Sequence, residues 1–487
     1  MSIPSDSYKR WRASLSRHQT ITSASPLNES DDPHTAPSEH AMQLVWLHQR
    51  IQRDRLRTLD GKRVQVLHPG FLNRDSGPDF KDAVIRIGLE PPGTVDVEID
   101  REASGWRQHH HATNPHYQDV ALHVIWDAPS APTPPRQQGG PPALAMRDVL
   151  DAPLAEILDV LASAPSYAPP GQVGRCSTFL RKLPSDALIE LLTQAAVVRL
   201  ARKAALCTAR AHAAGWHQAL WEILFVTLGY KPNVWPMRRI AECISEFRTA
   251  APKADSTEAW QARLLGVAGL LPAEITYQRP STDNYLRRLW DRWWRERDAF
   301  AQIQLPKSLW STRGLRPANR PERRLALAAH WLADPSFIPN IEAWALMDAP
   351  PPEAAARLAK LLQPPTDPFW SHHLTLHSKI TRAPAALLGN DKVADLAVNA
   401  ILPWFHARAA RDAALRTRIE QRYFSWPASA DNQSLRAVRS RLFGGARPEI
   451  PRTAAMQQGQ LQIMRDFCDH SNALCDHCGF PDLVHSL

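Results

Sequence analysis

Apolar and polar residues alternate along the first part of the chain in the pattern typical of short β-strands. Four such segments are predicted, at residues 64–66, 83–87, 95–99 and 120–126. Alternation with a period of two places one set of side chains on each face of a sheet. Residues 39–53 instead carry apolar side chains at helical spacing, which predicts a helix ahead of the strands. These elements together predict a compact α/β core over residues 38–130.

From about residue 149 the apolar spacing becomes helical and stays so. Leu, Ala and Arg dominate the predicted helices, and Pro-rich segments separate them. The helices are expected at residues 187–213, 216–228, 260–271, 286–300, 323–332, 354–362 and 393–411. The expected fold class is therefore α+β overall, with a short mixed sheet in the N-terminal core and a large all-α domain after it.

Changes in composition give the expected boundaries between these parts. Residues 1–37 are rich in Ser, Thr, Pro and charge, which predicts a disordered tail. Residues 131–148 form a Pro/Gly-rich linker, and residues 149–460 form the helical domain. Residues 461–487 carry three of the six cysteines, so we expect a metal clasp there.

Charge and composition narrow the class of protein further. Of 487 residues, 44% are apolar, which is ample for a packed core, and the net charge is +9. An excess of basic groups, mostly arginine, favours a polyanionic partner such as DNA or RNA. No apolar run reaches the roughly 18 residues that a membrane helix needs, and the N-terminus lacks a hydrophobic signal core. We expect a cytoplasmic protein with no membrane partner, and the oligomeric state stays open.

The acidic residues around the second and third predicted strands suggest chemistry. Asp79 follows Pro78 at the start of one predicted strand, and Glu98 and Asp100 lie on the next. Glu98 is nineteen positions after Asp79. The three carboxylates could converge at one end of a hairpin and bind Mg²⁺ or Mn²⁺. Glu39 could add a ligand or position water. The alternative is a turn whose acids line a solvated sheet face.

Several histidines follow the acidic hairpin. His109 and His111 could bind a metal, protonate a leaving oxygen or contact phosphate. A run of three histidines also occurs by chance on protein surfaces. His123 lies within an apolar strand, so we expect it to be a hydrogen-bonded core residue.

The C-terminal cysteines have the spacing of metal ligands. Cys468, Cys475 and Cys478 form C-x6-C-x2-C, and two thiolates on a tight turn suit Zn²⁺ or an iron-sulfur cluster. Three cysteines require a fourth ligand, which a nearby histidine could supply. The alternative is a set of unrelated reduced thiols.

A basic segment rich in tryptophan lies between residues 285 and 325. Its arginines could contact phosphates while its tryptophans stack on bases. Alternatively, the apolar residues form a buried stripe on a helix and the arginines lie on its solvent-exposed face. Within it, Arg316, Asn319 and Arg320 lie in a rigid Pro-containing loop that reads as a nucleic-acid contact.

A set of short motifs resembles a known family. They are Asp60-Gly61, Gly70-x-x-Asn73, Gly77-Pro78-Asp79-Phe80-x-x-Ala83, Val97-Glu98-Ile99, Trp106-x-x-His109-x-His111, Tyr117, Leu122-His123-Val124, Gly266-x-x-Gly269, Arg316-Pro-x-Asn319-x-Pro321 and the terminal cysteines. The chain after residue 39 thereby resembles the uncharacterised bacterial family catalogued as domain of unknown function 2851. That family has no established activity.

The N-terminal block of that family in turn looks like the PD-(D/E)XK nuclease superfamily. This resemblance implies Asp79 and Glu98 as metal ligands, with Asp100 at the position of the superfamily's lysine. Lys81, two residues after Asp79, could supply the missing cation. The resemblance also points to Cys176 as the fourth ligand of the cysteine clasp.

The preferred hypothesis is a metal-dependent nuclease-like protein that hydrolyses phosphodiester bonds of nucleic acid. One alternative is a catalytically inactive nucleic-acid-binding or scaffold protein of the same fold. A second alternative is a metal-dependent hydrolase of a small phosphoester.

Overall fold

The chain divides into two compact units, which are described separately. In the computed structural model, unit 1 comprises Met1–Gln194, Ala437–Pro448 and Leu461–Leu487, and unit 2 comprises Ala195–Arg436 and Glu449–Gln460. The structure describes residues 7–9, 37–73, 77–108, 111, 114–129, 140–161, 173–230, 233–250, 256–272, 280–312, 315–430, 433–446, 448–468, 475 and 478–485.

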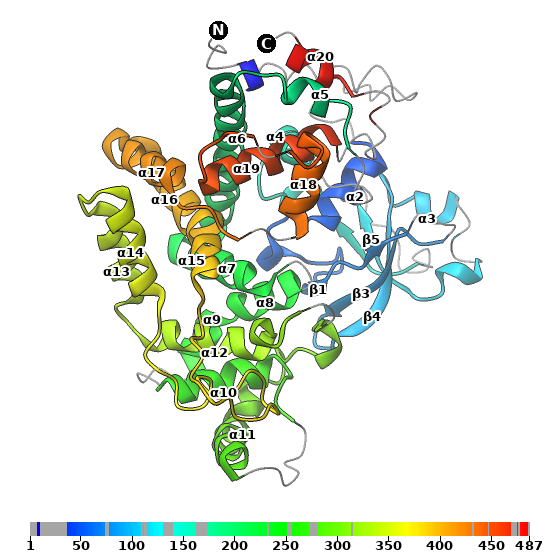
Figure 1. The fold of residues 1–487 in the computed structure, drawn as a ribbon. Helices are drawn as coiled ribbons and strands as arrows, with labels where there is room; N and C mark the ends of the chain where they lie inside the picture. The colour runs from blue at the N-terminus through cyan, green and yellow to red at the C-terminus, as the bar shows by residue number, and fades with distance from the viewer. Residues whose placement is uncertain are drawn as a thin grey trace. The chain divides into compact units, whose positions relative to one another are not determined.

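Unit 1 contains a mixed sheet. Its strands are β1 (Val64–His68), β2 (Phe71–Leu72), β3 (Phe80–Ile87), β4 (Gly93–Ile99), β5 (Val120–Ile125) and β6 (Ala143–Ala145). The order is β1-β3-β4-β5-β6, with β2 also paired to β3. Figure 1 labels strands β1, β3, β4 and β5 of this sheet. Strands β1 to β4 pair antiparallel, whereas β5 and β6 join in parallel.

The pairing of β3 with β4 determines where the acidic residues meet. Phe80 at the start of β3 lies opposite Val97 near the end of β4. A bulge follows in β3, where Asp82 takes a positive φ of 55°. Antiparallel pairing therefore brings the residue before β3 next to the last residues of β4.

The core of unit 1 lies between the sheet and helix α2 (Glu39–Leu47). Side chains of α2 at helical spacing pack against the inward-facing positions of the strands. Among the fully buried members of this core are Met42, Val45, Trp46, Val64, Phe80, Ala83, Val97, Leu122 and Val124.

Helices make up most of the rest of the chain. Unit 1 contains α3 (Gly105–Gln108), α4 (Leu154–Leu161), α5 (Ser177–Leu180) and α20 (Phe480–His485). Three helices continue along the chain from one unit into the other, namely α6 (Ser185–Ala214), α18 (Gln433–Phe443) and α19 (Ala454–Ile463). Unit 2 contains α7 (Trp216–Gly229), α8 (Val234–Glu242), α9 (Ile244–Ala250), α10 (Thr257–Val267), α11 (Pro280–Phe300), α12 (Pro321–Ala333), α13 (Phe337–Leu346), α14 (Pro351–Leu362), α15 (Asn390–Leu396), α16 (Leu402–Arg408) and α17 (Ala413–Ser425).

The predicted fold class is confirmed, with differences at element ends. Helix α2 ends at Leu47 rather than near residue 53, and Gln49 has a positive φ of 49°. Strand β6 was not predicted, and it lies in the segment assigned from composition to a linker. In the part of the chain that the structure describes, no helix is long and apolar enough to cross a membrane.

Candidate metal centre

Strand β4 and the residue directly after it present two acids on one face of the sheet. Val97 and Ile99 point into the core and are 0% and 2% exposed. Alternation therefore places Glu98 and Asp100 together on the opposite face. The segment that follows β4 contributes Trp106 to this face, and Trp106 is buried like Glu98 and Asp100.

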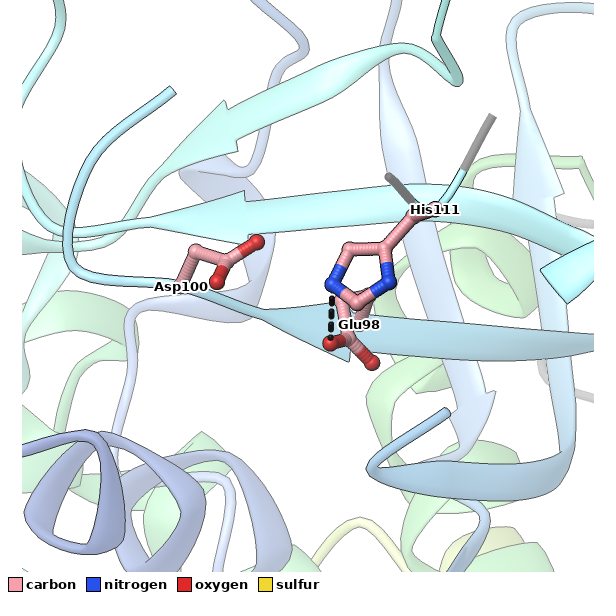
Figure 2. Close-up of side chains that lie close together, drawn as sticks. All are labelled: Glu98, Asp100 and His111. Atoms are coloured by element: carbon pink, nitrogen blue, oxygen red, sulfur yellow. Dashed lines mark ion pairs between the residues drawn. The ribbon is translucent and has the colours of Figure 1, made fainter. Parts of the chain in front are cut away.

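Glu98, Asp100 and His111 form a compact group of potential metal ligands. One ligand atom from each side chain lies within 4.8 Å of the other two. His111 Nε2 is 3.2 Å from Glu98 Oε1 (Figure 2). All three side chains are buried. Two carboxylates and an imidazole at this spacing can hold a divalent cation.

Asp100 is positioned by two features. Its Oδ2 is 2.8 Å from His123 Nε2, and both residues are buried. A Cβ on Gly105 would lie 2.6 Å from the Asp100 carboxyl group, so only glycine allows α3 to approach this closely. The prediction that His123 is a hydrogen-bonded core histidine is confirmed.

Asp79 lies beside the group and supports it. Its backbone N–H donates to Glu98 Oε2 at 3.0 Å, its Oδ2 accepts from Ile99 N at 3.1 Å, and its Oδ1 accepts from Gln43 Nε2 at 2.8 Å. The predicted convergence of Asp79 with Glu98 is therefore confirmed. Among the described residues, however, the close ligand group contains His111 and not Asp79.

The proximity of these acids opposes their ionisation. Burial raises the pKa of Glu98 to about 9, and the charges of Asp79, Asp100 and Glu39 add to the effect. Burial likewise raises the pKa of Asp79 to about 6, although the hydrogen bond from Ile99 N acts in the other direction. At neutral pH the group therefore retains a proton, which a cation would displace.

Aromatic rings hold His111 in place. Tyr117 stacks on it with ring centroids 3.9 Å apart, and Trp106 lies 5.3 Å away. Burial and the charges of Glu98, Asp79 and Asp100 raise the pKa of Tyr117 to about 12. Its phenol consequently stays neutral and can donate a hydrogen bond.

Comparison with known proteins assigns this chain to a family. Residues 39–430 match the family described as "Protein of unknown function (DUF2851)". The chain belongs to this family. No curated protein and no solved structure matched the chain.

The family membership confirms the predicted resemblance to DUF2851, whereas the further resemblance to PD-(D/E)XK nucleases stays a prediction. Of the other predicted site residues of this DUF2851 protein, Glu39 is near the grouped acids, whereas Lys81 interacts with Asp96, outside the group. Glu39, on α2, is close enough to raise the pKa of Asp79 and Glu98. The charge of Lys81 lowers the pKa of Asp96, but burial raises it more, so the pKa of Asp96 lies above its ordinary value. His109 lies outside the described residues.

The predicted cysteine clasp is not borne out, because the cysteines do not cluster. In the described ranges, no three of the sulfurs of Cys176, Cys468, Cys475 and Cys478 lie within 4.8 Å of one another. Arg441 lies among them instead and donates to Cys475 Sγ at 3.1 Å. Burial raises the pKa of Cys176 to about 12 and of Cys468 to about 11, so these thiols stay protonated. Among the residues that the structure describes, these cysteines therefore provide no preformed ligand set for the expected Zn²⁺ or iron-sulfur cluster.

Part of the loop predicted to contact nucleic acid makes contacts within unit 2 instead. Asn319 ends a short 3-10 helix (Pro317–Asn319), and its Oδ1 accepts from Arg324 Nη2. Arg316 is exposed, and Arg320 is partly buried at the N-cap of α12. Arg316 is therefore the residue of this set best placed to meet a partner, which stays a prediction.

Gln43 was missed by sequence reasoning, although a signal for it existed. Glu39 and Gln43 are four residues apart on α2, so they share one helix face. Once Glu39 is placed at the acidic site, that spacing predicts Gln43 beside it.

Proposed function

We propose that this protein is a metal-dependent nuclease that hydrolyses phosphodiester bonds of nucleic acid. The observation that carries the proposal is the buried group of Glu98, Asp100 and His111. The raised pKa values of Glu98 and Asp79 support it, because carboxyl groups that the fold holds together at such a cost are typical of a functional site. A net charge of +9 favours a polyanionic substrate.

The ligand set suits Mn²⁺ better than Mg²⁺. Mg²⁺ prefers oxygen ligands and retains several waters, whereas Mn²⁺ accepts an imidazole beside carboxylates. Glu98, Asp100 and His111 would hold the ion. His123 and Gln43 would orient the acids from behind through the hydrogen bonds already described.

The bound ion would supply charge stabilisation at phosphorus and a more acidic water. Hydrolysis forms a bond from a water oxygen to phosphorus and breaks the bond to the leaving oxygen, which takes up a proton. The neutral Tyr117 hydroxyl could donate to a phosphate oxygen. Glu39, exposed at the N-terminus of α2, could orient water on the solvent side.

Two observations favour a second candidate, a nucleic-acid-binding protein without turnover. Asp100 stands at the position where the PD-(D/E)XK nucleases, which the N-terminal block resembles, carry a cationic lysine, and it is hydrogen-bonded to His123 at 2.8 Å. The three ligand side chains are also only 6%, 2% and 7% exposed, which restricts access for a polymer.

The test is cleavage of labelled single- and double-stranded DNA and RNA with Mn²⁺ or Mg²⁺. The wild-type protein is compared with Glu98→Gln/Asp100→Asn and with Asp96→Asn. Asp96 precedes Glu98 by two residues on β4 and lies outside the ligand group, so it is the matched control.

Metal-dependent cleavage that disappears only in the double variant supports the nuclease. Binding that weakens with salt, without cleavage and without a metal requirement, supports the second candidate. Turnover of a small phosphoester in the absence of nucleic-acid binding would instead support a small-substrate hydrolase.

A further inference from the structure

Unit 2 contains a cavity of about 770 Å³ that three histidines line. Its walls come from α10, α11, α12 and the segment between α14 and α15. The histidines are His330, His372 and His373. The volume is in the range of small-molecule sites. This cavity has no part in the metal centre of unit 1.

A buried aspartate orients the first histidine. His330 Nε2 is 2.9 Å from Asp367 Oδ2, and both side chains are more than nine-tenths buried. Asp367 also accepts from Gln261 Nε2 and from the backbone N–H groups of Phe369 and Trp370. Burial opposes ionisation of Asp367, yet these hydrogen bonds hold its pKa below the usual value. A carboxylate only accepts, so His330 carries its hydrogen on Nε2 and leaves Nδ1 for a ligand.

Backbone carbonyls orient the other two histidines in the same way. Nδ1 of His372 is 3.2 Å from Thr381 O, and Nδ1 of His373 is 3.2 Å from Ser378 O. Each Nδ1 therefore donates, and each Nε2 is left over. His373 is only 3% exposed. Within the described ranges, the remaining ring nitrogen of each of the three histidines has no hydrogen-bond partner.

The segment that carries His372 and His373 is held by hydrogen bonds from Arg323 although it has no helix or strand. It extends over residues 363–389, and long irregular segments of more than about 12–15 residues in compact domains are usually functional. The fully buried Arg323 donates to the carbonyls of Trp370, His373, Ala385 and Ala386. One guanidinium thus joins residues 370–373 of the segment to residues 385–386.

The cavity also contains groups that suit an anion. Ser256 caps α10, and its neighbour Thr257 lines the wall, so the positive end of an eleven-residue helix points toward the site. Arg288 lies at the rim, paired with Glu258 at 3.0 Å. Pro365, Pro368 and Ile380 form an apolar wall.

The geometry points to a binding site for a small phosphomonoester in unit 2. Arg288 would contact the phosphate through charge-assisted hydrogen bonds. Burial lowers the pKa of His373, and a bound dianion would act in the opposite direction by favouring protonated imidazole. The organic part would lie on the apolar wall. A single metal ion fits less well, because the free nitrogens of the three described histidines are not all within 4.8 Å of one another. A ligand that spans them is favoured.

The test is calorimetric titration of the full chain in EDTA with inorganic phosphate, AMP or adenosine. AMP should bind about tenfold or more tighter than either phosphate or adenosine, because only AMP offers both parts. Arg288→Gln should weaken AMP binding by about 10- to 100-fold. Glu258→Gln should strengthen it, since it removes a negative charge and releases Arg288. The matched control is Glu353→Gln/Arg357→Gln, which removes an exposed ion pair of α14.

Two results would overturn the inference. One is no binding of AMP or phosphate by the wild-type protein. The other is binding of AMP and adenosine with equal affinity that neither Arg288→Gln nor Glu258→Gln alters, which would indicate a nucleobase site. Because EDTA is present, and because Glu98→Gln/Asp100→Asn should bind AMP normally, failure of the proposed nuclease leaves this result unaffected.

Discussion

Two buried carboxylates, one in each unit, show opposite electrostatics. Glu98 in unit 1 has other acids as neighbours, and its pKa rises to about 9. Asp367 in unit 2 has donors as neighbours, and its pKa is lowered. Both side chains are more than nine-tenths buried. Burial alone therefore does not decide the charge of a carboxyl group, because the hydrogen-bond donors around it can outweigh desolvation.

The comparison separates a carboxylate that hydrogen-bond donors surround from one whose neighbours are mostly other acids. Groups of the protein itself satisfy the hydrogen-bonding capacity of Asp367, since four donors surround it. Glu98 accepts from one backbone N–H and otherwise faces Asp79, Asp100 and His111. A cation would convert this repulsion into attraction. The predictions below test that distinction.

The largest effect of a substitution on stability is expected at Asp367. Asp367→Asn removes the charge that holds His330 and leaves donors without a full acceptor, so it should destabilise unit 2 by about 3–5 kcal/mol. Chemical unfolding in EDTA measures this. In the same assay Glu98→Gln should change stability by less than about 1 kcal/mol, because glutamine mimics the protonated acid. Equal losses in the two variants would contradict the comparison.

The second effect concerns metal affinity. Glu98→Gln/Asp100→Asn should weaken Mn²⁺ binding by about 100-fold or more, since loss of even a supporting group commonly costs about 10–100-fold. Free Mn²⁺ measured by electron paramagnetic resonance reports the affinity. Asp96→Asn is the control and should bind Mn²⁺ like the wild type.

The third effect tests the approach of α3 to Asp100. Gly105→Ala would place a Cβ 2.6 Å from the carboxyl group, which overlaps with it. We expect a loss of about 1–3 kcal/mol of stability and a weaker Mn²⁺ affinity. Gly389→Ala is the matched control, because a Cβ there meets nothing within 4 Å. Unchanged Mn²⁺ affinity in Gly105→Ala would show that Asp100 is not a ligand.

The fourth effect is a dependence of stability on pH. The pKa of Glu98 is higher in the folded protein, at about 9, than its ordinary value of 4.5. The folded state therefore binds the extra proton, and stability should fall as pH rises between these values, by up to about 1.4 kcal/mol per pH unit. Denaturation curves in EDTA measure the slope. Saturating Mn²⁺, or Glu98→Gln, should reduce it, and a slope that neither alters would argue against Glu98 as its source.

The smallest effect is expected at Gln43. Gln43→Ala removes the hydrogen bond to Asp79 Oδ1 and should cost about 1 kcal/mol. The pKa of Asp79 should rise further, because this bond favours the ionised form. Titration of the Asp79 carboxyl by NMR checks the direction, and a fall in that pKa would contradict it.

Local pattern was sufficient for the fold class and for part of the acidic site. The period-two segments predicted β1, β3, β4 and β5 because alternation depends only on neighbours along the chain. The convergence of Asp79 with Glu98 followed from the short distance between two adjacent antiparallel strands. Helix ends were less predictable, as α2 shows, since Gln49 turns the chain out of the helix.

Only the tertiary structure decided which distant segments are in contact. Among the described residues, it grouped His111 rather than Asp79 with Glu98 and Asp100 as potential ligands, and it placed Arg441 among cysteines whose spacing suggested a metal. It also joined Gln261, His330 and Asp367 in one network, although no spacing links them. The amino-acid sequence by itself determined the strands, the helices and the acids at one sheet end, because those depend on local periodicity. Ligand choice and charge state depend on distances and donors across the fold, which periodicity does not encode.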